Sequence, residues 1–316
     1  MKISGFTFVR NAVRLDYPVV ASVQSILPIV DEFVVNVGNS DDGTLDLIRS
    51  IGSPKVRIVE SHWNPNVTAG GYVLAQQTNV ALFNCTGTWA IYLQADEAIH
   101  ERDHAWLHTM MTKYADDDRV EGLLLRRLTF FGDYKTINDV RPFSRDLACR
   151  VVKPHRFVLS RGDAAGFTVH PKFKERGRRI RTVDTGLDFF HYADVRDVSR
   201  SADFHGEKFN FWDHKVAASR QASAPDGYYR RLPRKFLVAY RGTHPAPMQG
   251  RIARHQNSLD HNSPEWRTEL TLRERQTLLL TWMDRTIGRL PVPGVKTNRI
   301  VASHRGEAGA AAHHAD

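Results

Sequence analysis

The first hundred residues alternate short apolar runs with amphipathic stretches. Four apolar runs, rich in β-branched residues, have the length of buried strands, over residues 3–9, 32–37, 56–60 and 89–93. Three stretches between them have helical spacing of apolar positions, over residues 16–30, 44–51 and 70–83. In the first, Asp16 is expected to cap the helix, with Pro18 in its first turn. This alternation predicts βαβ units and a mainly parallel sheet, with a ligand crevice beyond the carboxyl ends of the strands.

The pattern changes after a further helix, which we expect from Asp103 to Tyr114. Strand-like stretches follow, and a region with weak periodicity comes next, rich in His, Arg, Phe, Gly and Pro. Helical character returns over residues 264–290. We therefore expect four parts. Residues 1–120 form an α/β half, and residues 121–260 complete the sheet and face a substrate. Residues 261–302 form a helical segment, and residues 303–316 a disordered tail.

Composition is that of a globular protein. The 316 residues are 41% hydrophobic and 25% charged, which is enough apolar material for a substantial core. The opening residues read as a strand and not as a signal peptide, and no run reaches the ~18 apolar residues of a membrane-spanning helix. Cys85 and Cys149 lie in core-like segments without paired spacing, which favours core thiols in a reducing, cytoplasmic compartment.

The net charge of +9 is typical of a protein that binds a polyanion, but charge alone does not say which kind of polyanion. Nucleic acid, anionic lipid head groups and the diphosphate of a nucleotide sugar are all attracted by a basic surface. A nucleic-acid-binding protein is one alternative, although the basic residues are spread along the chain and no zinc spacing accompanies them. The basic, amphipathic C-terminal segment is a second candidate surface, for an anionic membrane.

Two acidic residues follow the fourth strand, in the sequence Gln94-Ala95-Asp96-Glu97. Carboxylates at the edge of a core need a partner. Mg²⁺ or Mn²⁺ bridging a diphosphate is one such partner, because hard cations bind carboxylate and phosphate oxygens. The alternative is a helix start, where Asp96 or Glu97 would face the positive end of the helix dipole.

A polar turn follows the second strand, from Gly38 through Asn39, Ser40, Asp41 and Asp42 to Thr44. Gly and Asn permit a tight backbone turn, and the Ser and Asp side chains offer acceptors for a base or a ribose. Thr44 is expected to cap the next helix.

The order of these segments resembles a family 2 glycosyltransferase of the GT-A fold. The resemblance rests on Phe8-Val9-Arg10-Asn11-Ala12, on the turn at residues 38–44 and on Leu93-Gln94-Ala95-Asp96-Glu97, in a bacterial branch with QADE in place of the usual DxD motif. Later segments at residues 162–167, 191–196 and 242–245 are similar to the same branch, so that the resemblance spans roughly residues 3–250. It implies a Rossmann-like α/β half that binds a nucleotide sugar and a C-terminal acceptor-side subdomain.

The resemblance also implies roles for particular residues. The base and ribose would contact two segments, through Phe8, Val9, Arg10 and Asn11 in the first and Asn39, Asp41 and Asp42 in the second. Gln94, Ala95 and Asp96 would line the donor site, and Asp96, Glu97 and His191 would hold a divalent cation. Asp163 would be the general base of an inverting transfer. Without the resemblance, His191 also reads as a packed histidine and Asp163 as a turn cap.

The sequence departs from the family pattern in two places. Gln94 stands where the first aspartate of DxD is usual, so that one anionic ligand is missing and metal dependence is open. Val37 and Gly38 replace an acidic pair that commonly reads uracil, which leaves UDP, GDP or dTDP open as the donor nucleotide.

The predicted activity is transfer of a sugar to a hydroxyl of a glycan, a lipid-linked acceptor or a small molecule, in surface polysaccharide or glycoconjugate synthesis. The expected location is cytoplasmic, with peripheral contact to the inner face of a membrane as an extension of that hypothesis. A catalytically silent nucleotide-sugar-binding protein is the second alternative. A nucleotidyltransferase is disfavoured, because Phe8 to Ala12 lacks a Gly-rich phosphate loop.

Overall fold

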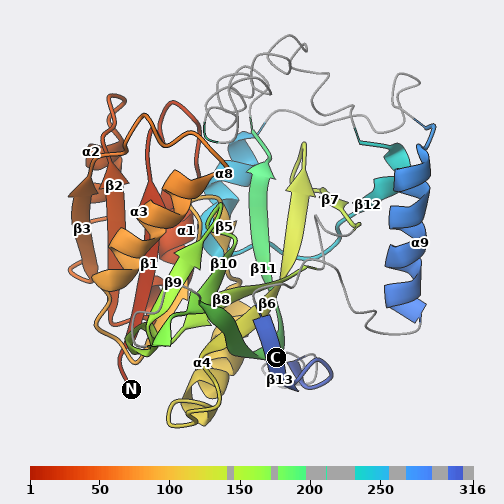
Figure 1. Ribbon diagram of the computed structural model, residues 1–316. Coiled ribbons are helices and arrows are strands. Elements are labelled where there is room, and N and C mark those ends of the chain that lie inside the picture. Colours follow the sequence, from red (N-terminus) through yellow and green to blue (C-terminus); the bar gives the residue numbers. More distant parts are fainter. Residues whose placement is uncertain are drawn as a thin grey trace.

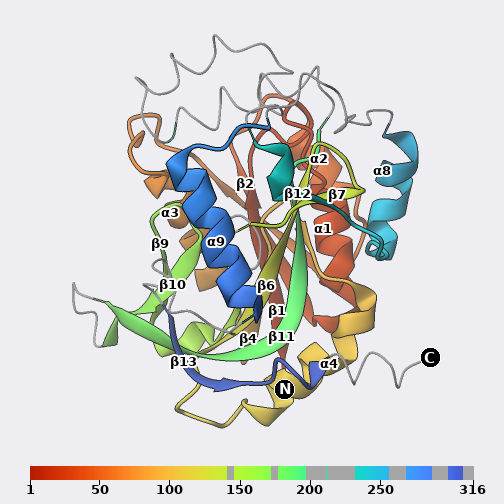
Figure 2. The same cartoon turned by 90° about the vertical axis from the view of Figure 1, so that its right-hand side faces the viewer.

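The computed structural model describes residues 1–140, 146–171, 177–196, 211, 232–255, 268–286 and 298–308. In this part of the chain a large mixed sheet is flanked by helices, as Figures 1 and 2 show from two sides. The α/β class predicted from the sequence is confirmed. Among the helices of the described residues, none has the combined length and apolarity needed to cross a bilayer.

Four parallel strands form the amino-terminal half of the sheet in the order β3-β2-β1-β4. Their bounds match the four predicted runs closely: β1 (Ile3–Val9), β2 (Glu32–Gly38), β3 (Val56–Ser61) and β4 (Trp89–Tyr92). Because these strands are parallel, their carboxyl ends meet at one edge of the sheet. The segments that follow β1, β2 and β4 therefore start from the same edge.

Helices cover both faces of this half. They are α1 (Val19–Ile26), η1 (Leu27–Ile29), α2 (Thr44–Arg49), α3 (Tyr72–Phe83), η2 (Glu101–Asp103) and α4 (His104–Lys113). Side chains of α1, α2 and α4 pack with Phe33 and Val35 of β2, whereas Val34 packs on the other face with side chains of α3. Such alternation follows from the two-residue period of a strand. The predicted cap is wrong: α1 begins after Pro18, because the Asp16 carboxylate binds Arg251 instead.

The second half of the sheet is mixed. Strand β8 (Leu147–Val152) lies between β4 and β6 (Gly122–Phe131) and is antiparallel to both. The long strand β11 (Arg178–Asp194) then pairs in parallel with β6. The expectation of a mainly parallel sheet holds for the amino-terminal half and needs this correction beyond it.

Short elements complete the fold. They are β5 (Glu97–Ala98), β7 (Thr136–Asn138), η3 (Pro154–Arg156), β9 (Val158–Arg161), β10 (Gly166–Val169), η5 (Arg234–Phe236), β12 (Leu237–Ala239), η6 (Ala246–Met248), α8 (Gln249–Arg254), α9 (Leu272–Thr286) and β13 (Asn298–Ser303). Strand β13 joins the sheet beside β11, and α9 lies at the right-hand side of the molecule in Figure 1. Of the tail expected to be disordered, residues 309–316 lie outside the described residues.

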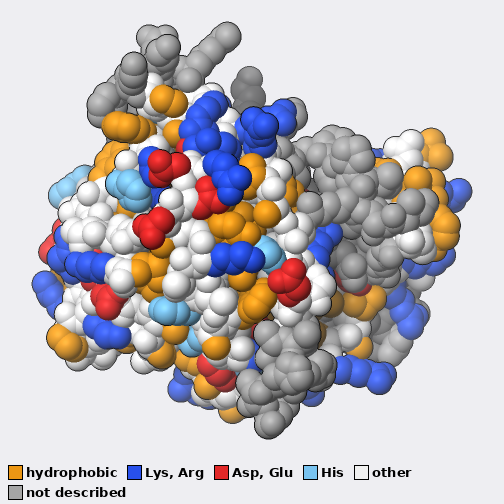
Figure 3. Space-filling view, turned by 90° about the horizontal axis from the view of Figure 1, so that it is seen from below, with side chains coloured by type: hydrophobic (Ala, Val, Ile, Leu, Met, Phe, Trp, Pro, Cys, Tyr) orange, Lys and Arg blue, Asp and Glu red, His pale blue; other side chains and the backbone are white. Residues whose placement is uncertain are grey.

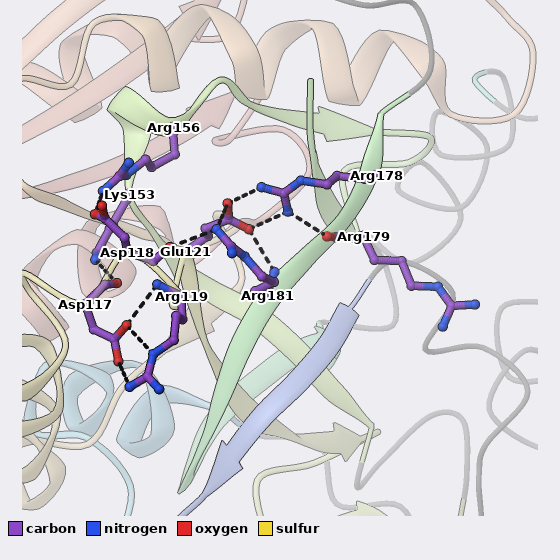
Figure 4. A network of polar contacts seen from close by, with 9 residues as sticks. All are labelled: Asp117, Asp118, Arg119, Glu121, Lys153, Arg156, Arg178, Arg179 and Arg181. Atoms are coloured by element: carbon purple, nitrogen blue, oxygen red, sulfur yellow. Dashed lines mark hydrogen bonds and ion pairs between the residues drawn. The ribbon is translucent and has the colours of Figure 1, made fainter. Parts of the chain in front are cut away.

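A buried carboxylate joins the starts of β6 and β11. Glu121 accepts hydrogen bonds from Arg178 at 2.7 Å and from Arg181 at 2.8 Å (Figure 4). Nearby, Arg119 pairs with Asp117, so that several of the basic side chains here are matched by acids. Figure 3 shows the same mixture of basic and acidic side chains over the lower face of the molecule.

Both cysteines are free thiols. Cys149 on β8 is fully buried and Cys85 is partly buried. Burial raises the pKa of each thiol to about 12, which makes both poor nucleophiles at neutral pH. The prediction of core thiols is confirmed.

Candidate active site

The turns after β1 and β2 bind each other directly. Arg10 donates from Nε to the Asn39 carbonyl at 3.1 Å, and the Asn11 amide donates to Ser40 Oγ at 3.0 Å. Asn11 has a positive φ of 52°, which asparagine tolerates better than most residues. The two predicted nucleotide-binding segments are therefore brought together into one polar surface.

Asp42 shapes this surface through hydrogen bonds from backbone amides to its carboxylate. Its carboxylate accepts from the Arg14 amide at 2.8 Å and from the Thr44 amide at 3.1 Å. Burial alone would raise the pKa of Asp42, but these hydrogen bonds outweigh it and hold the pKa below its usual range. Asp42 is thus a turn-forming anion, whereas Asp41 beside it is exposed.

Trp63 completes the surface and was missed by the sequence analysis. Its indole is 8% exposed, lies 5.8 Å from the Phe8 ring and has the Arg10 guanidinium 5.6 Å from its centroid. The Trp63 amide donates to Asn39 Oδ1 at 3.0 Å. An aromatic residue shortly after the third predicted strand, at the same sheet edge, was the available signal.

Gly38 is required by this tryptophan. A Cβ atom added at Gly38 would lie 2.3 Å from Nε1 of Trp63, closer than any real contact. The Nε1 atom is buried and has no hydrogen-bond partner. The glycine at position 38 thus makes room for an indole.

Two predicted donor-site residues point into the core. Val9 and Ala95 are buried in the cluster that includes Val23 of α1 and Leu93. The Gln94 carbonyl accepts from Ser22 Oγ at 3.1 Å. The side chains of Val9 and Ala95 are therefore part of the core.

The predicted metal ligands Asp96 and His191 lie side by side. Oδ1 of Asp96 is 4.0 Å from Nε2 of His191, and Oδ2 is 3.9 Å from Nη2 of Arg196. The Tyr192 amide donates to the Asp96 carbonyl at 2.8 Å, which holds β11 against this segment. Strand β11 therefore delivers the histidine to the aspartate from a distant part of the sequence.

This pair fits a divalent cation that shares its coordination with a substrate. A carboxylate oxygen and an imidazole nitrogen 4.0 Å apart are close enough to bind one ion. Among the described residues, no group of three His, Cys, Asp or Glu side chains forms a metal site by itself. Phosphate oxygens and water would have to supply the other ligands, as is usual for Mg²⁺.

Glu97 is placed differently from its prediction. Its carboxylate accepts two hydrogen bonds from Arg150, and each side chain is 1% exposed. Oε2 also accepts from the Gln94 amide at 3.1 Å. With its oxygens bound in this way, Glu97 is suited to fix the segment rather than to ligate a metal, so we leave it out of the metal site.

Asp163 lies at the turn between β9 and β10, among residues with positive φ. Gly162 has φ 59° and Ala164 has φ 64°. Asp163 Oδ1 accepts from the Ala165 amide at 3.3 Å, as in the turn-cap alternative. Within the described residues, no hydrogen bond or ion pair joins Asp163 to Asp96 or His191.

The segment at residues 242–245 supports the strand that carries His191. His244 is hydrogen-bonded to the Tyr192 hydroxyl at 2.9 Å and to the Tyr134 carbonyl at 2.8 Å. Thr243 is 2.9 Å from Nε2 of His100. Burial lowers the pKa of His244, so that the neutral imidazole braces β11 from the face opposite His191.

Arginines link β11 and α8 to the loop after β1. Arg196 donates from Nε to the Leu15 carbonyl at 3.0 Å, and its guanidinium lies 4.9 Å from the Tyr17 ring centroid. Arg251 of α8 donates to the Asp16 carbonyl at 2.9 Å. The loop is thereby tied to the end of β11 that holds His191.

Comparison with solved structures finds partial likenesses. Residues 1–349 of TarS from S. aureus, in complex with UDP, match with a TM-score of 0.39 and 12% identity, over 75% of this chain and 80% of that chain. Glucosyl-3-phosphoglycerate synthase from Mycobacterium tuberculosis, in complex with Mn²⁺, UDP and glucosyl-3-phosphoglycerate, matches with a TM-score of 0.34 and 14% identity, over 52% and 62% of the two chains. No protein-family model and no curated protein sequence matches. Likenesses this weak assign no activity, and the fold stands on its own strand pairing.

Proposed function

We propose that the protein is a glycosyltransferase that moves a sugar from a nucleotide-diphosphate sugar to an acceptor hydroxyl. The observation that supports this most is the meeting of Asp96 and His191, at 4.0 Å, beyond the strand edge that also carries the turns after β1 and β2. Ligands of open α/β sheets bind outside the carboxyl ends of the strands. A nucleotide across this edge would place its diphosphate towards Asp96.

The nucleoside would bind where Arg10, Asn39 and Trp63 meet. The partly exposed ring of Phe8, packed against Trp63, offers a stacking surface for a base, and stacking is tolerant of base identity. The exposed Asp41 offers acceptors for the ribose, whereas the buried Asn11 holds the turn beside it through its bond to Ser40. The donor base is left open between uracil, guanine and thymine.

Asp96 and His191 would hold Mg²⁺ or Mn²⁺ together with the diphosphate. When bound, the ion stabilises the negative charge of the departing nucleoside diphosphate as a Lewis acid. Arg196, 3.9 Å from the other Asp96 oxygen, orients the carboxylate. The neutral Gln94 leaves the site one negative charge weaker than a DxD site, so metal dependence is a quantity to be measured.

Asp163 is our candidate for the general base. Its carboxylate would take the proton of the acceptor hydroxyl while the acceptor oxygen bonds to the sugar C1 and the bond from C1 to the diphosphate breaks. The outcome is inversion at C1, with the nucleoside diphosphate as the leaving group. Asp163→Asn is expected to lower kcat by roughly 10²–10⁴-fold while nucleotide binding stays unchanged.

The direct test is release of nucleoside diphosphate from UDP-, GDP- and dTDP-sugars by the purified protein, with and without Mn²⁺. Release that stops in Asp96→Ala supports the transferase. Nucleotide binding without release, with all acceptors tried, would favour the catalytically silent alternative. Absence of both would contradict the proposed function.

We further propose that α9 rests on an anionic membrane beside the enzyme. We call this helix inverted because large apolar side chains face outward and a polar one faces inward. Trp282 is 57% exposed and Leu279 is 55% exposed, whereas Thr281 is 3% exposed. Arg273 and Arg275 are exposed on the same helix. Apolar side chains next to cations suit a bilayer with negative head groups.

A second copy of the chain is a weaker match to this surface. Each copy has a net charge of +9, and two α9 helices would bring their exposed arginines together. The 15 residues of α9 are also too few to span a bilayer, so the helix would lie in its surface. The predicted cytoplasmic location stays a prediction.

A further inference from the structure

A partly buried cation on β6, Arg127, has no anionic partner among the residues that the structure describes. The Nε atom of Arg127 is buried and has no hydrogen-bond partner. Within the described part of the chain, no carboxylate forms an ion pair with this guanidinium. Burial and the neighbouring Arg150 both lower the pKa of Arg127, because each disfavours the charged form. A partly buried charge with no anion beside it is unfavourable, so its presence indicates a ligand that brings the missing negative charge.

Arg127 lies on the face of the sheet that carries His191. In the parallel pairing of β6 with β11, Arg127 is opposite Phe189 and Thr129 is opposite His191. Residues two apart on a strand share a face, and paired residues of neighbouring strands do so as well. Arg127 is therefore one step along the sheet from the candidate metal site.

On this face of the sheet, the positive charge of Arg127 is not matched by an ion pair with any described carboxylate. Arg150 stacks on the Phe189 ring, with its guanidinium carbon 4.6 Å from the centroid. Glu97 is paired with Arg150 through two hydrogen bonds, and it attracts Arg127 without forming an ion pair with it. Asp146 and Asp163 attract Arg127 only from beyond ion-pair distance.

The neighbouring arginine shows the contrast. Arg126 points to the opposite face, where both Asp188 oxygens accept its hydrogen bonds, one of them at 2.8 Å. Two adjacent arginines on one strand are thus in opposite states: Arg126 is paired with Asp188, and Arg127 has no anion bound to it within the described ranges. This difference supplies a matched control within the same strand.

We propose that Arg127 binds a phosphate or carboxylate group of one of the two substrates. A guanidinium forms two parallel hydrogen bonds with such a group. The acceptor is one source, because the proposed base Asp163 is among the acids that attract Arg127, as is Glu97 beside Asp96. The donor diphosphate is the other source. The anion site at Arg127 does not depend on the proposed function. Only the naming of the bound group as part of the donor or the acceptor rests on that function.

The test compares Arg127→Gln and Arg127→Lys with Arg126→Gln, using inorganic phosphate as the probe for the acceptor group. Calorimetry would measure phosphate binding while a nucleoside diphosphate saturates the donor site. We expect Arg127→Gln to weaken phosphate binding by roughly 10-fold or more, Arg127→Lys to weaken it less, and Arg126→Gln to leave it unchanged. Equal weakening of nucleoside diphosphate binding in Arg127→Gln would assign the anion to the donor.

The proposal is overturned if Arg127→Gln changes the binding of neither phosphate nor nucleoside diphosphate. It is also overturned if the wild type does not bind phosphate and Arg127→Gln leaves nucleoside diphosphate binding unchanged. Circular dichroism would verify that each variant is folded. Nucleotide binding by the wild type separates this test from that of the proposed function. A wild type that binds phosphate through Arg127 but no nucleotide would contradict the transferase and leave the anion site standing.

Discussion

Glu97 of β5 and Arg150 of β8 form a buried ion pair with two hydrogen bonds, at 2.6 and 2.8 Å. The pair anchors the residue next to Asp96 to the centre of the sheet. Arg150→Gln would leave the Glu97 charge buried without its partner. We expect it to lower the free energy of unfolding by about 3–5 kcal/mol, measured by urea denaturation.

The double variant Glu97→Gln with Arg150→Met is the control for this prediction. It removes both charges, so it should be less destabilised than Arg150→Gln alone. Equal losses in the single and double variants would show that packing, and not the unpaired charge, is responsible.

Glu121 should make stability depend on acid pH. Burial raises the pKa of its carboxyl, but hydrogen bonds from Arg178 and Arg181 outweigh burial and lower the pKa from 4.5 to about 2. A depressed pKa in the folded state stabilises the protein above pH 4.5, and this contribution is lost as the pH falls towards 2. Urea unfolding of Glu121→Gln should therefore show a large deficit at pH 6 that shrinks below about pH 4.

Asp46→Asn is the matched control for Glu121. The Asp46 pair with Arg49 is exposed, with 82% of the Asp46 side chain accessible. Its loss should change the unfolding free energy by less than about 0.5 kcal/mol at any pH. A deficit for Glu121→Gln that stays constant between pH 6 and pH 3 would contradict the pKa argument.

Gly38→Ala should disturb the nucleotide surface. The new methyl group would meet the Trp63 indole, which is packed by Phe8 and Arg10. We expect a loss of about 1–3 kcal/mol of unfolding free energy and weaker nucleotide binding. Gly250→Ala is the control: it has open space and lies in α8, so it should be neutral or slightly stabilising. Wild-type stability in Gly38→Ala would argue against the close contact.

The inverted helix α9 predicts binding to anionic vesicles. Wild-type protein should sediment with vesicles of phosphatidylserine and phosphatidylcholine at low salt, and less with phosphatidylcholine alone. Replacing Leu279, Leu280 and Trp282 by Ser should abolish sedimentation without loss of fold, because these side chains are exposed. Equal sedimentation of wild type and variant would refute the membrane contact, and a wild-type dimer that the variant loses would point to a second copy instead.

Much of the amino-terminal half was predictable because its signals are local. The apolar runs that became β1, β2, β3 and β4 are bounded by turn residues, and the polar segments after them had to meet at one edge. The contact between Arg10 and Asn39 follows from that parallel order. No equivalent rule says where an antiparallel strand is inserted, so the place of β8 between β4 and β6 could not be read from the sequence.

Residues of the site were harder to assign because their partners are remote in sequence. Glu97 had the sequence context of a metal ligand, and only the fold shows that Arg150 occupies both of its oxygens. The sequence places no constraint on which face of β6 carries an unpaired arginine, so the contrast between Arg126 and Arg127 also required the structure. His191 was named through a family resemblance, and the pairing of β5 with β11 brings it beside Asp96.

The most direct test of the central claim is thermal stabilisation of the wild type and of Asp96→Ala by UDP, GDP and dTDP, each with and without Mn²⁺. Ligands that bind the native state raise its melting temperature. We predict that one nucleotide raises the Tm of the wild type, that Mn²⁺ enlarges the shift, and that Asp96→Ala loses the part that depends on Mn²⁺. If no nucleotide changes the Tm of the wild type under either condition, the proposal that this sheet edge binds a nucleotide-sugar donor is contradicted.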